Sequence, residues 1–264
     1  MKPIESMKAT TALLLGLATG LFTAPAALAS GGGSHPYFRV DTTNLAGLQR
    51  GARDFMSYCS GCHGMKYLRY NRMAEDLGIS EDLLKANLMF ATQKVGDQMT
   101  VAMPKEAADW LGAQPPDLSL TARSRGPEWV SDYLQSFYID PSRPLGVNNT
   151  VLPGASMPHV LWELQGLQAK VEHAAAAEGH GEAKPEAHAA EEGHHGNKFE
   201  LVQKGKLSPE EYKKFVADIT NFMVYAAEPA RNKRISTGWN VLIFLSLFLP
   251  IAYLLKKEYW KDIH

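Results

Sequence analysis

The chain has 264 residues, 45% of them apolar, with two cysteines and a formal net charge of −1. This length and apolar content fit one or two domains whose core needs no disulfide bridges. The near-neutral charge does not favour a nucleic-acid partner, although residues 30–230 carry 25 acidic against 19 basic side chains, a balance that suits a basic protein partner.

Residues 1–29 have the organisation of a secretory signal peptide. Lys2 and Lys8 precede an apolar run, and Ala27-Leu28-Ala29 places small residues directly before Ser30. A retained membrane anchor is the alternative, but the apolar run is interrupted and short for a full span. We therefore expect cleavage after Ala29 and export of the rest of the chain.

Residues 45–58 are expected to form an amphipathic helix. Leu45, Leu48, Ala52 and Phe55 recur at spacings of three and four, which places them on one helical face. The helix leads directly into a pair of cysteines.

Those cysteines belong to Cys59-Ser60-Gly61-Cys62-His63, the pattern of covalent haem attachment. Residues i, i+3 and i+4 share a face of a helical turn, so both sulfurs and the imidazole can reach one porphyrin. A disulfide, a redox pair or a zinc site fits less well, because a histidine follows directly and the chain has no other cysteine. We expect one covalently bound haem c, with Cys59 and Cys62 as attachment points and His63 as iron ligand.

The iron of an electron carrier needs a second protein ligand, and a thioether raises its reduction potential relative to a second imidazole. Met103 and Met157 are equally good candidates from the residues alone, since each precedes a proline that would hold its loop rigidly. His159 is a minor third candidate. Four other methionines are weaker candidates. Met73 is close to the motif, Met89 and Met223 lie on helical patterns, and Met99 has no loop signature around it.

Between the motif and residue 158, short helical patterns at 81–90 and 127–138 alternate with Pro and Gly, and no convincing alternating strand is present. Residues 169–196 are rich in Ala, Glu, Gly and His and have few core-forming side chains, so we expect a solvated insertion. Its scattered histidines are more typical of a solubilising tract than of a metal site.

A second strong helix is expected at 208–227, because Ser208-Pro209-Glu210-Glu211 has the form of a capping box. We expect it to cross the helix at 45–58, with Gly51 as the point of close approach. Residues 236–256 then form an apolar stretch long enough for a transmembrane anchor, with 257–264 as a short tail. Together with the signal peptide, this places the haem domain at 30–230 on the periplasmic side of the inner membrane and the tail in the cytoplasm.

Four features occur together in this chain. They are the haem motif at the end of a helix, Pro115-Pro116-Asp117-Leu118-Ser119 followed by Arg123 and Arg125, a late methionine loop at 154–158, and Ala226-Ala227-Glu228-Pro229 before a single C-terminal span. In this combination the chain resembles the cytochrome c1 family, the haem subunit of the quinol:cytochrome c reductase (cytochrome bc1) complex. The resemblance extends from Tyr37 to the C-terminus, apart from the insertion.

The resemblance implies a mostly α-helical cytochrome c domain and favours Met157 over Met103 as the second iron ligand. It also implies that Arg123 contacts a haem propionate, which a guanidinium can bind with two hydrogen bonds. One departure is that Pro158-His159-Val160 follows the methionine, where the family often has two prolines.

The function implied by the resemblance is a single-electron relay from a Rieske iron–sulfur protein to cytochrome c, beside cytochrome b in the bilayer. This chain would make or break no substrate bond. The alternatives are a haem subunit of a terminal oxidase, a free-standing membrane-tethered cytochrome c, and a haem enzyme such as a peroxidase with an open sixth position.

Overall fold

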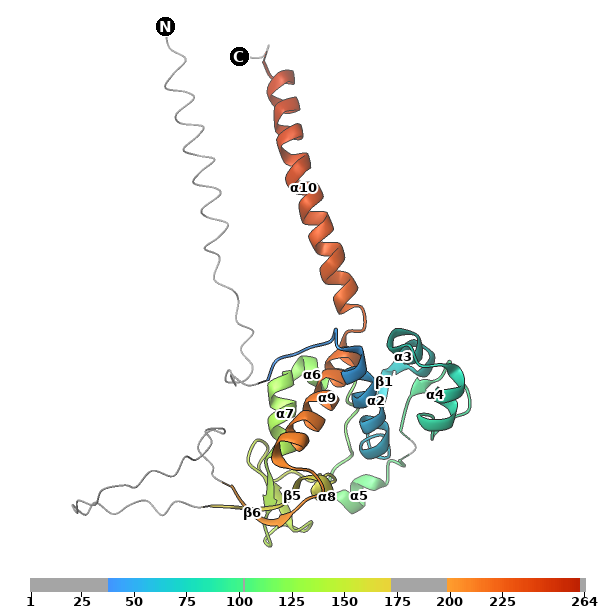
Figure 1. The fold of residues 1–264 in the computed structure, drawn as a ribbon, viewed down its shortest axis with the longest axis vertical. Helices are drawn as coiled ribbons and strands as arrows, with labels where there is room; N and C mark the ends of the chain where they lie inside the picture. The colour runs from blue at the N-terminus through green and yellow to red at the C-terminus, as the bar shows by residue number, and fades with distance from the viewer. Residues whose placement is uncertain (1–37, 102, 172–198, 262–264) are drawn as a thin grey trace, which may run out of the picture. The chain divides into compact units, whose positions relative to one another are not determined.

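The computed structural model describes residues 38–101, 103–171 and 199–261 (Figure 1). The expected signal peptide and nearly all of the expected insertion lie outside these residues. The elements in chain order are α2 (Leu45–Tyr58), β1 (Met65–Arg69), α3 (Tyr70–Leu77), α4 (Glu81–Asn87), β2 (Gln98–Met99), α5 (Ala107–Leu111), α6 (Thr121–Ser124), α7 (Pro127–Gln135), β3 (Phe137–Ile139), β4 (Val147–Asn149), α8 (Trp162–Gln165), β5 (Gly166–Lys170), β6 (Phe199–Lys204), α9 (Pro209–Ala227) and α10 (Arg231–Tyr259). The expected mostly α-helical fold is confirmed.

Both principal helices begin at side-chain caps. Asn44 Oδ1 accepts the N–H of Gly47 at 3.0 Å at the start of α2. At the start of α9, Ser208 and Glu211 form the expected capping box, and these hydrogen bonds lower the pKa of the Glu211 carboxyl. Each cap satisfies backbone N–H groups that the first helical turn leaves without a partner.

Helix α9 packs against α2 on one side and α7 on the other (Figure 1). At the crossing with α2, a Cβ added to Gly51 would lie 2.1 Å from the carbonyl oxygen of Asp218, so only glycine permits this approach. Phe55 and Phe222, both fully buried, pack beside it with ring centroids 5.7 Å apart. Burial of each such side chain contributes about 1.5–3 kcal/mol, which makes the crossing a main source of stability.

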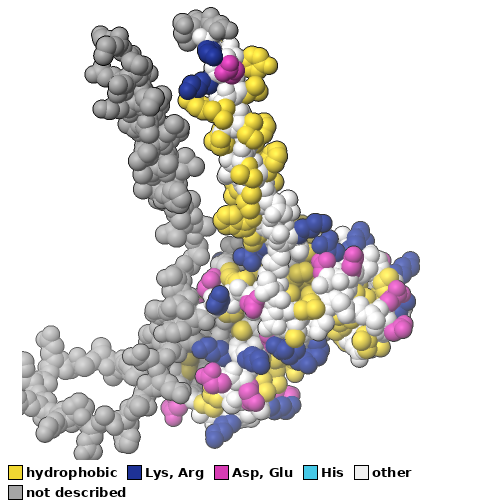
Figure 2. Space-filling view, turned by 45° about the horizontal axis from the view of Figure 1, so that its top comes forward, with side chains coloured by type: hydrophobic (Ala, Val, Ile, Leu, Met, Phe, Trp, Pro, Cys, Tyr) yellow, Lys and Arg dark blue, Asp and Glu magenta, His cyan; other side chains and the backbone are white. Residues whose placement is uncertain are grey.

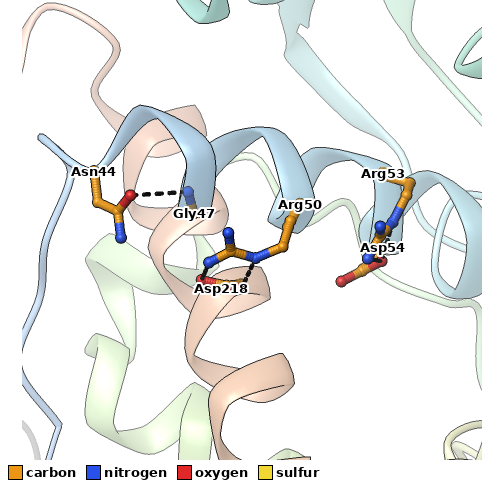
Figure 3. Close-up of polar contacts among 6 residues, drawn as sticks. All are labelled: Asn44, Gly47, Arg50, Arg53, Asp54 and Asp218. Carbon is orange, nitrogen blue, oxygen red and sulfur yellow. Dashed lines mark hydrogen bonds and ion pairs between the residues drawn. The ribbon is translucent and has the colours of Figure 1, made fainter. Parts of the chain in front are cut away.

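A polar contact reinforces the same crossing (Figure 3). The guanidinium of Arg50 donates to both carboxylate oxygens of Asp218, from Nε at 2.7 Å and from Nη2 at 3.1 Å. The hydrogen bonds to Asp218 raise the pKa of Arg50 above its usual value. One turn further along α2, Arg53 donates to its buried neighbour Asp54.

The structure differs from the sequence-based expectation in its strands. Three two-stranded antiparallel sheets are present among the described residues, pairing β1 with β2, β3 with β4 and β5 with β6. The helix expected at 127–138 ends at Gln135, because Phe137–Ile139 pairs with Val147–Asn149, and the one expected at 81–90 ends at Asn87. Strands of two to six residues are too short to show an alternating pattern in the sequence.

Strands β5 and β6 flank the residues expected to form the insertion. Lys170 of β5 is the Cα partner of Phe199 of β6. Ala169 and Lys170, counted with the insertion in the sequence-based expectation, therefore belong to a strand. The hairpin brings the two ends of the segment between them close together.

Helix α10 is 29 residues long, about 43 Å at 1.5 Å per residue, and none of its residues is buried. Within the described part of the chain it is the one helix long and apolar enough to cross a membrane, and it contains the stretch expected at 236–256. Hydrophobic side chains cover much of its surface, with lysines near its C-terminal end (Figure 2). Its first turn is tied to the start of the domain, since the Thr42 hydroxyl donates to Oδ1 of Asn232 and Nδ2 of Asn232 donates to the backbone carbonyl of Thr42, both at 3.0 Å.

Candidate functional site

A cavity of about 570 Å³ lies next to the end of α2. Its lining comes from the end of α2 with the cysteine motif, the loop at 113–118, helices α6 and α7, the loop at 152–158, and one face of α9. The lining side chains are mostly apolar, and among them are Cys59, Cys62 and His63. The cavity is thus enclosed partly by helices and partly by loops.

The cysteine motif forms a tight turn directly after α2. The N–H of Cys59 still donates to Phe55, and the N–H groups of Cys62 and His63 both donate to the carbonyl of Cys59, at 3.1 and 2.8 Å. Both thiols are free, and burial raises the pKa of the Cys59 thiol to about 12. The sulfur is therefore a protonated thiol at neutral pH, and the two cysteines form no disulfide.

The imidazole of His63 is oriented by the loop between α5 and α6. Its Nδ1 lies 2.7 Å from the carbonyl oxygen of Pro116, which can only accept, so Nδ1 carries the proton. Burial lowers the pKa of this imidazole, which favours the neutral form. Nε2 is then left with a free lone pair, the state that a metal-ligating histidine requires.

The loop that supplies Pro116 is itself fixed to the motif. The N–H of Leu118 donates to the carbonyl of Gly64 at 2.8 Å, and Asp117 accepts the N–H of Lys66 at 2.8 Å and that of Ser119 at 3.0 Å. The run from 115 to 119 stood out in the sequence only as a family marker. In the structure, it holds the carbonyl that orients His63.

Three methionines line the cavity: Met103, Met157 and Met223. Met103 and Met157 lie on loops, as expected, whereas Met223 projects from α9 and was set aside as a core residue. His159 is not among the lining residues; its ring stacks on Phe137, with centroids 5.1 Å apart and planes 4° from parallel. Burial lowers its pKa to about 4.

The two arginines after the Pro-Pro run are placed differently. Arg125 lines the cavity, with its guanidinium over the ring of Trp129 at 5.2 Å. Both arginines are exposed, but Arg123 does not line the cavity and acts electrostatically on Glu228. Sequence spacing could not have separated the two, because Arg125 ends α6 and Trp129 lies in α7, with Gly126 at a φ of +96° between them.

Comparison with known proteins agrees with this geometry. The model of the Cytochrome C1 family matches residues 38–177 and 200–263. The chain belongs to the cytochrome c1 family. Family membership implies that it binds haem c, and with the apolar helix α10 it indicates a membrane-anchored electron-transport protein.

Proteins similar to this chain have different names. A cytochrome c1 from Allochromatium vinosum is 49% identical over 251 residues, which cover 94% of this chain and 98% of the relative. A protein of Nitrosomonas europaea named ammonia monooxygenase gamma subunit is 44% identical and covers 85% of this chain and 87% of its own. A cytochrome b/c1 from Bradyrhizobium diazoefficiens is 25% identical over 82% of this chain, which matches 33% of that longer protein.

The residues that line the cavity of this chain fit a haem c. Two free thiols stand three residues apart at one wall, the next imidazole has its Nε2 free, and the rest of the lining is mostly apolar. These are the groups that haem attachment and iron ligation require.

Proposed function

We propose that this chain is the haem subunit of a cytochrome bc1 complex and relays single electrons from a Rieske iron–sulfur protein to a cytochrome c. The observation that carries the proposal is the 2.7 Å contact between His63 Nδ1 and Pro116, in a cavity that also contains both cysteines. Membership of the cytochrome c1 family and the relative named cytochrome b/c1 support the assembly.

The chain's own groups would hold the cofactor and shape its surroundings. Cys59 and Cys62 would hold the haem through two thioether bonds, each thiol S–H adding to one vinyl C=C bond, and His63 Nε2 would bind the iron. A bound haem c supplies reversible one-electron exchange at its iron. The apolar lining from α7 and α9 excludes water, which favours the less charged oxidation state.

Met157 is our choice for the second iron ligand. Met103, Met157 and Met223 all line the cavity, so position alone leaves three candidates. Met223 is a core residue of α9 with only 4% of its surface exposed, which suits filling the interior. Met157 lies on a loop whose backbone forms hydrogen bonds with the side chains of Asn149, Asn148 and Arg143, and the family resemblance favours it over Met103.

For the haem propionate, the geometry supports Arg125 in place of Arg123. Arg125 lines the cavity and Arg123 does not. Stacking on Trp129 limits the freedom of the Arg125 guanidinium, so less entropy is lost when it binds a carboxylate.

In the membrane, we place α10 across the bilayer with the haem domain on the periplasmic side and the C-terminal tail in the cytoplasm. The signal-like residues 1–29 support export of the domain. Cytochrome b and the Rieske protein would then be neighbours within the membrane complex, and a soluble or tethered cytochrome c would be the acceptor.

Replacing Met157 by Leu tests the ligand assignment. Haem should stay covalently attached, because both thioether bonds remain, while the reduction potential falls by on the order of 100 mV and the reduced protein binds carbon monoxide. Met103→Leu is the matched control and should leave the potential and the carbon monoxide reaction unchanged. The opposite pattern would transfer the ligand role to Met103.

Purification of the intact membrane complex tests the assembly. We expect a dihaem cytochrome b and a Rieske protein to co-purify with this chain. Recovery with monooxygenase or terminal oxidase subunits instead would contradict the proposal.

A further inference from the structure

The loop that carries Met157, residues 150–158, follows directly after β4. Side chains of the β3–β4 hairpin hold its backbone at two points, near its start and at Gly154. These contacts suggest how the methionine is kept in place.

Asn149 holds the start of the loop. It is fully buried, and its Oδ1 accepts the N–H groups of Val151 at 2.9 Å and Leu152 at 3.1 Å. Its Nδ2 donates to the carbonyl of Tyr133 at 2.8 Å, and the hydroxyl of Ser136 lies 3.2 Å from Oδ1. The first turn of the loop is therefore tied to the last turn of α7, whose Tyr133 lines the same cavity.

Asn148 and Arg143 hold the second point. Oδ1 of Asn148 accepts the N–H of Gly154 at 2.8 Å, and Nη2 of Arg143 donates to the carbonyl of Gly154 at 2.8 Å. Asp140 in turn accepts from Nδ2 of Asn148 at 2.9 Å. The N–H and the carbonyl of Gly154 are thus both fixed three residues before Met157, at a φ of +79° that favours glycine.

We propose that Asn149 is a positioning residue for Met157, assisted by Asn148 and Arg143. This inference rests on the proposed function, because it requires Met157 to be an iron ligand. Ordering each backbone residue costs about 1–2 kcal/mol, so a loop without these anchors would lose entropy whenever its thioether bound. With these anchors the loop is already ordered before the thioether binds, so a larger fraction of the molecules has Met157 bound to the iron.

The test compares Asn149→Ala with Arg143→Gln in the full-length protein. Asn149→Ala leaves the N–H groups of Val151 and Leu152 without their acceptor, and we expect about a tenfold increase in the ratio of open to thioether-bound protein. The measurements are the weak far-red absorption band of thioether-bound ferric haem, the extent of carbon monoxide binding, and the reduction potential. The band should weaken, carbon monoxide binding should rise, and the potential should fall, with covalent haem content unchanged.

Arg143→Gln should act in the same direction but more weakly, since it removes one contact of a half-exposed side chain. Asn149→Asp keeps an oxygen that accepts from the loop but loses the Nδ2 donor to Tyr133 and buries a carboxyl group, so it should recover only part of the band. Arg143→Gln also serves as the decisive variant if Asn149→Ala yields no mature protein.

Leu84→Ala is the matched control for general destabilisation. Leu84 is buried in α4, does not line the cavity, and its loss should lower stability without altering band, potential or carbon monoxide binding. The inference is overturned if Asn149→Ala and Arg143→Gln leave all three measurements at wild-type values, or if Leu84→Ala changes them equally. If Met157→Leu itself changes none of them, the ligand assignment has failed instead.

Discussion

The cavity has two kinds of wall, and they are stabilised differently. The helix wall, formed by α2 and α9, is held by the close approach at Gly51, by buried rings and by the Arg50–Asp218 ion pair. The loop wall, formed by residues 112–118 and 150–158, is held mainly by side chains that bond to backbone groups, such as Asp117 and Asn149. We infer that the helix wall determines whether the domain folds, whereas the loop wall determines how the iron ligands are presented.

The largest effect is expected at Gly51. In Gly51→Val, the new side chain would meet the backbone of α9 at 2.1 Å and force the helices apart, which should cost at least about 3 kcal/mol of unfolding free energy. The measurement is the yield of haem-bearing protein and its thermal unfolding. Gly96→Ala is the control, because Gly96 lies outside the haem motif and a Cβ there meets nothing within 4 Å; equal stability of the two variants would contradict the packing argument.

A smaller effect on the helix wall is expected from Arg50→Ala. It leaves the carboxylate of Asp218, 11% exposed, without its counter-ion and should lower the unfolding free energy by about 1–3 kcal/mol. Asp218→Asn should cost less, because Arg50 is 37% exposed and can turn to water. Denaturant unfolding measures the free energy of unfolding of both variants. A larger decrease in Asp218→Asn than in Arg50→Ala would show that the buried carboxylate left without a counter-ion is not the main cause of the destabilisation.

On the loop wall, Asp117→Ala should change the haem more than the stability. It removes the acceptor for the N–H groups of Lys66 and Ser119, at a cost of about 1 kcal/mol, and frees the loop whose Pro116 carbonyl orients His63. The reduction potential and the Soret spectrum should shift, whereas Glu75→Ala, at an exposed position of α3, should change neither. Unaltered haem properties in Asp117→Ala would remove the distinction between the walls.

The smallest effect is expected outside both walls. Replacing residues 171–198 by Asn-Gly would connect Lys170 to its strand partner Phe199 by a two-residue turn and should change the unfolding free energy by no more than about 0.5 kcal/mol. The deletion removes six acidic against two basic residues, so reduction of a basic cytochrome c should slow, mainly at low ionic strength. Loss of haem would show that this segment supports the cavity, and an unchanged low-salt rate would rule out its role in steering.

Sequence reasoning was most accurate where the signal is local. The helix at 45–58 has the bounds predicted for it, and the capping box at Ser208 and the close approach at Gly51 are present. Local signals suffice there because caps, helical periodicity and glycine at a crossing act within a few residues.

The amino-acid sequence alone was enough to predict the haem motif, the two crossing helices, the apolar C-terminal helix and, through its motifs, the family. The packing of the folded chain was needed to show that Arg125 and not Arg123 lines the cavity, that His159 stacks on Phe137 instead, and that three short antiparallel strand pairs form among the described residues. The physical reason is that these features depend on contacts between segments distant in the chain. Which face a loop side chain presents, and which carbonyl meets His63, follows from how those segments pack and not from the residues beside them.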